Sequence, residues 1–188
     1  MDAAAHYRHL LSLGRDEFLA AAAPAVLVRH RADDQDPAVT GAQTLTMDGD
    51  GLDDDADAGR ADAADETLPH SKLTPDDSDL ELYPLAKKPG ASFPDRITIG
   101  RTPNNDVVIA EHSVSRLHAY VRQIPAARGW VVADGGSKNG SWLDDAPLDP
   151  RREVALPAGS VVRLGDVILT FYPSADLFDL LGDDHDRR

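Results

Sequence analysis

Cysteine is absent from the 188-residue sequence, and so are long apolar runs. Without thiols the chain can form neither a disulfide nor a thiolate metal site; this fits a reducing compartment, and we expect a cytoplasmic protein. The longest apolar run, Phe18 to Val28, has 11 residues and contains Pro24, whereas about 20 are needed to span a bilayer. Because the run is too short, we expect no transmembrane helix and no membrane partner. Because no basic region precedes it, we also expect no secretory signal peptide.

Basic residues are scarce, with 19 Lys and Arg against 33 Asp and Glu and a formal net charge of −14. Such an excess of negative charge disfavours nucleic acid and acidic membranes as partners. The charge is unevenly distributed: residues 1–84 carry 6 basic against 19 acidic side chains, and residues 85–175 carry 11 against 9. The second region is therefore slightly basic, and the acidic residues lie in the flanks.

The chain divides by composition into four parts. In the first part, residues 1–30, the strong helix formers of residues 3–23 have apolar side chains on one face, and Pro24 ends this predicted helix. The run Ala25 to Arg29 adds either a short strand or an extended exit. Residues 31–80 have too little apolar surface to order and are predicted to be an acidic disordered linker. A folded domain over residues 81–182 and a polar tail over 183–188 complete the chain.

The folded part shows many short runs of alternating apolar residues. Strands are predicted at Leu82 to Ala86, Arg96 to Ile99, Val107 to Ile109, Ala119 to Ile124, Trp130 to Asp134, Val161 to Leu164 and Val167 to Phe171. Short strands with turn signals every 8 to 12 residues or so indicate an all-β fold, a β-sandwich. A short closing helix is predicted at Ala175 to Leu181, with Ser174 as its N-cap.

Two groups of candidate metal ligands are set aside. His6 and His9 have a chelating spacing but no third ligand nearby. The segment from Asp48 to Asp53 resembles a calcium loop but has Leu52 at a ligand position. We expect no metal site and no cofactor.

Polar clusters follow or precede several of the predicted strands and so fall in loops. They are Gly100-Arg101, Ser115-Arg116-Leu117-His118 and Ser137-Lys138-Asn139-Gly140-Ser141-Trp142. Guanidinium, hydroxyl, ammonium and amide donors occur in them without a carboxylate, which is the chemistry of an oxyanion site. The pattern predicts a phosphate receptor.

These three motifs, in this order and separated by strand-like runs, resemble the signatures of the forkhead-associated (FHA) domain. The resemblance covers roughly Leu82 to Gly182. It implies a β-sandwich of two antiparallel sheets with peptide-binding loops at one end.

The resemblance also implies roles for individual residues. Arg101 and Ser115 would bind the phosphate of a phosphothreonine, and Arg116 would add positive charge beside it. Asn139 would bind the backbone of the peptide. Lys138 departs from the family pattern, in which Ser or Thr is commoner, and would add a cation that favours nearby acidic residues. Structural support of the site is assigned to Gly100, His118, Ser137, Gly140 and Ser141.

The leading hypothesis is a phosphothreonine-binding adaptor, not an enzyme, of bacterial origin by its composition and acting downstream of Ser/Thr protein kinases. The alternative is a scaffold that binds a protein partner independently of phosphate. An enzymatic triad of Ser115, His118 and Asp134 is disfavoured, because these residues have no nucleophile elbow and no oxyanion motif.

The linker supplies candidate phosphosites at Thr44, Thr46 and Thr74. The resemblance implies that the domain begins at the end of the sandwich away from the peptide loops, so a tethered ligand must cross about 25 to 30 Å. Eight residues from Thr74 to Leu82 reach at most about 29 Å, whereas the longer tether from Thr46 typically spans about 30 to 36 Å. We therefore predict that phosphorylated Thr44 or Thr46 closes on the domain's own site, and that Thr74 acts mainly in trans.

Overall fold

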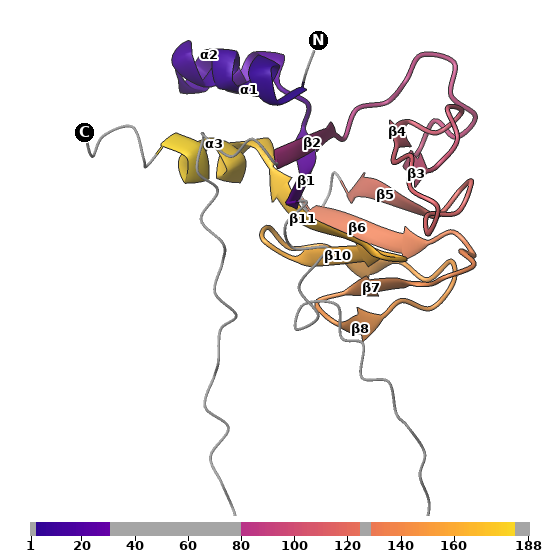
Figure 1. Ribbon diagram of the computed structural model, residues 1–188. Coiled ribbons are helices and arrows are strands. Elements are labelled where there is room, and N and C mark those ends of the chain that lie inside the picture. The colour runs from indigo at the N-terminus through magenta and orange to yellow at the C-terminus, as the bar shows by residue number, and fades with distance from the viewer. Residues whose placement is uncertain (1–2, 31–79, 125–128, 183–188) are drawn as a thin grey trace, which may run out of the picture.

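A computed structural model of the chain describes residues 3–30, 80–124 and 129–182 (Figure 1). The helices are α1 (Ala3–Ser12), α2 (Arg15–Ala21) and α3 (Ser174–Gly182), and the strands are β1 (Ala25–His30), β2 (Leu80–Pro84), β3 (Ile97–Gly100), β4 (Val107–Val108), β5 (Ala119–Ile124), β6 (Gly129–Asp134), β7 (Ser141–Leu143), β8 (Ala146–Pro147), β9 (Val154–Ala155), β10 (Val161–Leu164) and β11 (Val167–Pro173). No helix in these ranges is long and apolar enough to cross a membrane.

The strands form two sheets. The larger has the order β2-β1-β11-β10-β7-β8, and the smaller has the order β4-β3-β5-β6-β9. All neighbouring strands within the sheets are antiparallel except β3 and β4. The main core lies between the sheets and includes Ile99, Val132 and Phe171, which are fully buried. The predicted all-β sandwich is confirmed.

Strand β1 lies between β2 and β11, with Leu27 opposite both Tyr83 and Phe171. The sandwich is therefore not confined to residues 81–182, and the run after Pro24 is a strand. Leu27 points into the main core, whereas Val26 and Val28 belong to a second apolar cluster on the other face. A strand buried on both faces needs a continuous apolar run, so the alternation that marks half-buried strands is missing here.

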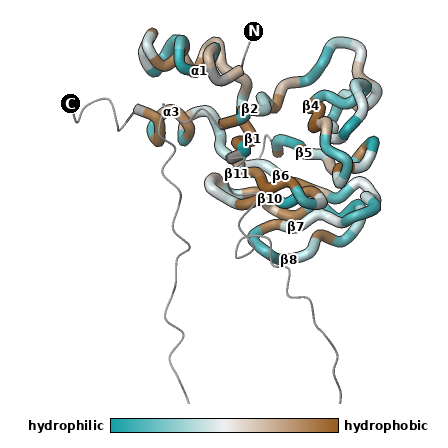
Figure 2. Tube along the Cα trace, viewed as in Figure 1, coloured by the Kyte–Doolittle hydropathy of each residue, from teal (hydrophilic) through white to brown (hydrophobic). Residues whose placement is uncertain are grey.

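The three helices pack together on the outer face of the larger sheet. One helix was predicted over residues 3–23, but the chain forms α1 and α2 on either side of Gly14. Tyr7 and Phe18 of these helices join Leu177 of α3 and Val26 of β1 in the second cluster. Figure 1 shows the helices on the side of the sandwich away from β3 and β4, and Figure 2 shows apolar segments on the helices and on the neighbouring strands.

Two local predictions need correction. Ser174 begins α3, but its hydroxyl donates to the carbonyl oxygen of Ala23, so the side chain joins the helix to the N-terminal segment. Strands β7, β8 and β9, of two or three residues each, were not predicted. Asp144 and Asp145 connect β7 to β8 with positive φ angles of 47° and 65°, the backbone of a tight type I′ hairpin turn.

The position of β1 predicts the effect of truncating Leu27, which is fully buried in the main core. Leu27→Ala should lower the free energy of unfolding by about 2 to 5 kcal/mol. Leu13→Ala, at a leucine that is 46% exposed, should change it by about 0.5 kcal/mol or less. Urea denaturation measures both, and a Leu27→Ala variant as stable as Leu13→Ala would contradict the central placement of β1.

Candidate functional site

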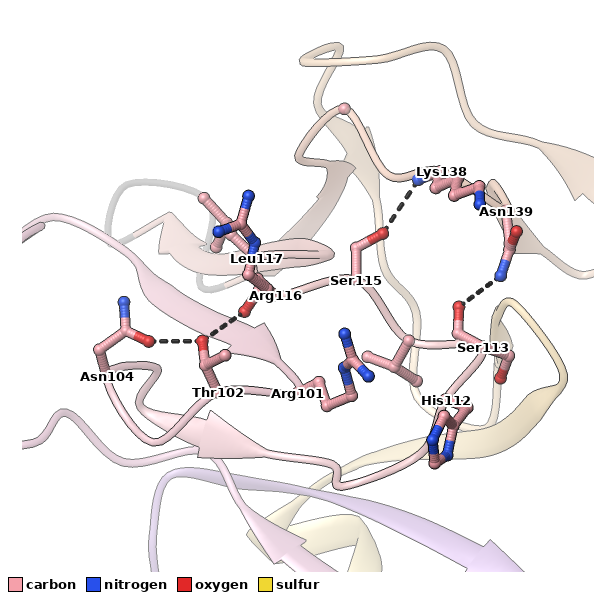
Figure 3. Close-up of a pocket in the computed structure, with 12 residues that line it drawn as sticks. Arg101, Thr102, Asn104, His112, Ser113, Ser115, Arg116, Leu117, Lys138 and Asn139 are labelled. Carbon is pink, nitrogen blue, oxygen red and sulfur yellow. Dashed lines mark hydrogen bonds between the residues drawn. The ribbon is translucent and has the colours of Figure 1, made fainter.

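The loops after β3, β4 and β6 converge on an open pocket of about 920 Å³. Figure 3 shows the side chains that line it. The lining residues are Arg101, Thr102, Asn104, His112, Ser113, Val114, Ser115, Arg116, Leu117, Gly136, Lys138 and Asn139. They include three cations and no carboxylate, so the pocket has the chemistry of an anion receptor.

Ser115 is held in place by bonds from all three loops. Its carbonyl oxygen accepts a hydrogen bond from the Arg101 N–H at 2.9 Å, and its own N–H donates to Nδ1 of His118 at 2.9 Å. Its Oγ accepts from the backbone N–H of Lys138, also at 2.9 Å. The hydroxyl therefore stands at a fixed place in the pocket before any ligand binds.

His118 is fully buried and connects two of these loops. Because Nδ1 accepts from Ser115, the proton is on Nε2, which donates to the carbonyl oxygen of Gly140 at 2.9 Å. Burial lowers the pKa of His118, and the bond to Gly140 and the charge of Asp134 offset this only in part. The ring is therefore neutral in the folded protein, with a defined tautomer.

Asp134 organises the loop that leads to Lys138 and Asn139. Its Oδ1 accepts from the N–H groups of Gly136 at 2.7 Å and Ser137 at 2.9 Å, and its Oδ2 accepts from the hydroxyls of Ser137 and Ser141. Burial by itself would raise the pKa of Asp134, but these hydrogen bonds outweigh it and hold the pKa below its usual value. The carboxylate thus stays charged and fixes the turn.

Gly100 permits the close approach of the first two loops. A Cβ at this position would lie 2.4 Å from the carbonyl oxygen of Arg116, so any other side chain would force the loops apart. Asn105 donates to that same oxygen at 2.6 Å and to the carbonyl oxygen of Thr102 at 2.9 Å.

Asn139 is bonded within the protein as well as facing the pocket. Its Nδ2 donates to the carbonyl oxygen of Ser113 at 2.8 Å. Ser113 in turn packs on the turn between β10 and β11: its Oγ accepts from the Asp166 N–H at 3.2 Å, and a Cβ on Gly165 would lie 2.7 Å from its carbonyl oxygen. Gly165 has a φ of +63°, so both its backbone and its contact with Ser113 favour glycine.

The three cations of the pocket do not point to one place. Figure 3 shows the Arg101 guanidinium between Ser115 and His112, whereas Arg116 points away beside Leu117. Across residues 3–30, 80–124 and 129–182, no ion pair is found for Arg101, Arg116 or Lys138. Their charge is available to a ligand.

Sequence reasoning missed several residues of this pocket. His112, Ser113 and Thr102 all line it. Only their positions beside the Ser115 and Arg101 motifs could have indicated them. The predicted phosphosites Thr44, Thr46 and Thr74 lie outside the described residues. Within those residues, no cluster of His, Asp or Glu could hold a metal ion.

The triad hypothesis does not fit the geometry. His118 uses both ring nitrogens on backbone groups, at Ser115 N–H and at Gly140 carbonyl, so neither is available to Ser115 Oγ. Asp134 is engaged by the hydroxyls of Ser137 and Ser141. A general base positioned on the serine hydroxyl is the requirement for such a nucleophile, and His118 does not meet it.

Comparison with known proteins identifies the domain. Residues 97–165 match the family model of the FHA domain. The chain therefore contains an FHA domain.

Two relatives illustrate the extent of the likeness. The chain is 34% identical over 77 residues to the FHA domain-containing protein FhaB of Mycolicibacterium smegmatis. This match covers 41% of this chain and 47% of FhaB. It is also 34% identical over 74 residues to the oxoglutarate dehydrogenase inhibitor of Corynebacterium diphtheriae, covering 39% of this chain and 48% of the relative. The chain thus spans less than half the length of these relatives.

Among solved structures, the chain is similar to Mycobacterium tuberculosis EmbR in complex with a low-affinity phosphopeptide. The sequence identity is 29%, the TM-score is 0.41, and the match covers 51% of this chain and 22% of EmbR.

The buried neutral His118 predicts a pH dependence of stability. Its folded pKa lies below the unfolded value of about 6.5, so its contribution is present above that pH and is lost as the pH falls toward the folded pKa. His118→Ala should lower the free energy of unfolding by about 2 to 4 kcal/mol at pH 7.5, because two partly buried backbone groups lose their partner. It should also reduce the loss of stability as the pH falls from about 7 to 5.5. Urea denaturation across this range measures it.

His112→Ala, which removes an exposed imidazole from the same pocket, is the matched control and should change stability by about 0.5 kcal/mol or less. Equal slopes of stability against pH in the wild type and His118→Ala would show that the ring is not kept neutral by the fold.

Proposed function

We propose that this FHA domain binds phosphothreonine peptides without catalysing a reaction, as a cytoplasmic adaptor acting downstream of Ser/Thr protein kinases. The observation that carries the proposal is the pocket with three cations and no lining carboxylate. A phosphate group brings about −1.5 to −2 charge and three strong acceptor oxygens, whereas an unmodified hydroxyl brings neither. Phosphorylation would therefore decide whether a peptide binds.

Arg101 and Ser115 are suited to the phosphate itself. The Ser115 Oγ already accepts from Lys138 N–H, so its hydrogen remains to be donated, and no acceptor for it is found within the part of the chain that the structure describes. Arg101 places a guanidinium beside it (Figure 3), which can form charge-assisted bonds to phosphate oxygens. The two groups would bind one phosphate from two directions.

Asn139 is suited to the peptide backbone. One hydrogen of its amide is engaged by the Ser113 carbonyl, which fixes the orientation of the side chain. The amide oxygen and the second hydrogen remain for an N–H and a carbonyl of an extended peptide. Lys138 and Arg116 lie at two sides of Ser115 (Figure 3), so we expect acidic residues near the phosphothreonine to strengthen binding.

The alternative is a scaffold that binds its partner independently of phosphate. It predicts equal affinity for a peptide and its phosphorylated form. Phosphate-dependent binding predicts a much higher affinity for the phosphorylated peptide. An unphosphorylated peptide would desolvate the cations of the pocket without supplying a counter-charge.

We also propose that the domain is regulated by a phosphorylated threonine of residues 31–79. The geometry assumed from the resemblance was wrong: β1 runs toward the start of β11, and Arg29 near its end contacts Glu111, which immediately precedes the pocket residue His112. Leu80 pairs with His30, so both ends of the connection lie at the same end of the sandwich as the pocket. The reason for assigning Thr74 mainly to binding in trans no longer holds, and Thr74 joins Thr44 and Thr46 as a candidate for closing on the domain's own site.

The binding proposal predicts that Arg101→Ala weakens a phosphothreonine peptide about ten- to a hundredfold, the cost of one charged hydrogen bond to a phosphate. Isothermal titration calorimetry with a phosphothreonine peptide and its unphosphorylated twin measures this. Arg152→Ala, at a side chain that is 74% exposed and outside the pocket, is the control and should bind like the wild type. Equal affinity for both peptides would favour the phosphate-independent scaffold.

The regulatory proposal predicts that kinase-treated protein binds an external phosphothreonine peptide at least about tenfold more weakly than untreated protein, because a tethered ligand has an effective concentration near the millimolar range. Substituting the phosphorylated threonine among Thr44, Thr46 and Thr74 by alanine should restore the affinity. Undiminished external affinity of phosphorylated monomer would rule the switch out.

A further inference from the structure

Arg29 is a nearly buried arginine near the end of β1, outside the motifs that predict the pocket. Its side chain is 9% exposed, and its guanidinium contacts two carboxylates. One is Oε2 of Glu81 on β2 at 3.3 Å, and the other is Oε1 of Glu111 in the loop after β4, at 2.9 Å. The two contacts link the first strands of the larger sheet to a loop of the smaller sheet.

Glu111 begins the turn that reaches the pocket. The Val114 N–H donates to the Glu111 carbonyl oxygen at 3.1 Å, so residues 111–114 form a tight turn with His112 and Ser113 at its tip. Both tip residues line the pocket. The Ser113 carbonyl then accepts the Asn139 side chain at 2.8 Å, and Ser115 follows directly.

This turn has three anchors from distant parts of the chain. Asn139 and the Asp166 N–H hold Ser113 from two sides, and Arg29 holds Glu111. A turn with few contacts of its own keeps a single position only when its ends are fixed. The Asn139 side chain is oriented by its hydrogen bond to the Ser113 carbonyl oxygen. Displacement of the turn would therefore displace the Asn139 amide, which faces the pocket.

We propose that Arg29 is a positioning residue of the phosphopeptide site, which fixes the turn of residues 111–114 through Glu111 and thereby orients Asn139. This rests on the proposed phosphothreonine-binding function and deepens it, because it assigns part of the site to the N-terminal segment. Residues 97–165, which match the family model, contain Glu111 but not its partner. The complete site would require β1.

An arginine suits this role better than a lysine. Its planar guanidinium can hold two carboxylates in fixed directions, whereas an ammonium group is a point charge on a flexible stem. The Tyr83 hydroxyl also donates to Oε2 of Glu81 at 2.8 Å, which fixes one carboxylate. Burial, together with the neighbouring Glu81, raises the pKa of Tyr83 to about 12, so this hydroxyl keeps its proton at neutral pH.

The test uses the full chain and the variants Glu111→Gln, Arg29→Lys and their combination. Glu111 is 40% exposed on its side chain, so Glu111→Gln should leave the midpoint of unfolding close to that of the wild type. Its affinity for a phosphothreonine peptide should fall about three- to tenfold, the effect of weakening about one hydrogen bond at the site. The affinity of the double variant should be no lower than that of the single variant with the lower affinity, because both substitutions break the same contact between Arg29 and Glu111.

A spectroscopic measurement distinguishes positioning from general loosening. The side-chain amide signals of Asn139 in the unliganded protein should shift in Glu111→Gln, because Ser113 is displaced. The matched control is the ion pair of Arg122 and Glu153, which lies outside the pocket. Nε of Arg122 donates to Oε1 of Glu153 at 3.1 Å. Arg122→Lys and Glu153→Gln should leave both the affinity and the Asn139 signals unchanged.

Affinity of Glu111→Gln within twofold of the wild type, or unchanged Asn139 signals, would overturn the proposal. The proposed function and the positioning role of Arg29 can be disproved separately. If the wild type bound no phosphothreonine peptide, the proposed function would fall, while the Asn139 signals would still report whether Arg29 and Glu111 hold the turn.

Discussion

The site depends on the hydrogen bonds of one buried neutral imidazole. His118 immediately precedes β5 of the smaller sheet, and the Gly140 carbonyl that it binds immediately precedes β7 of the larger sheet. The same ring accepts the Ser115 N–H. One side chain thus joins the two sheets at the end where the pocket lies and fixes the serine. Protonation would remove the acceptor at Nδ1, so the desolvation that keeps the ring neutral also preserves the site.

Around this ring, the polar groups of the loops are satisfied mainly by one another. Asp134, Asn105 and Asn139 each bond backbone groups of a neighbouring loop segment. The cations are left out of these networks, so the pocket is rigid and its charge is unneutralised. Preorganisation of this kind lowers the entropy that a ligand must lose on binding.

The sequence predicted the sandwich, because half-buried strands alternate, and it singled out loop motifs that the fold brings to one pocket. Strands β5 and β10 have the predicted bounds. The missed features share a different physical origin. β1 is buried on both faces and shows no alternation, and Ser113 acts through its carbonyl group, which every residue has. Contacts of the backbone, and pairs such as Arg29 and Glu111 that are 82 positions apart, leave no local pattern.

The long connection between β1 and β2 explains why β1 must be held so firmly. His30 and Leu80 are paired, although residues 31–79 separate them. By chain-length scaling alone, closing such a connection costs roughly 2 kcal/mol more than closing a four-residue hairpin loop. Burial of Leu27 in the main core and of Val26 and Val28 under the helices offsets that cost. The helical cap therefore supports the sandwich by covering β1, and through Arg29 the same strand reaches the turn at the pocket.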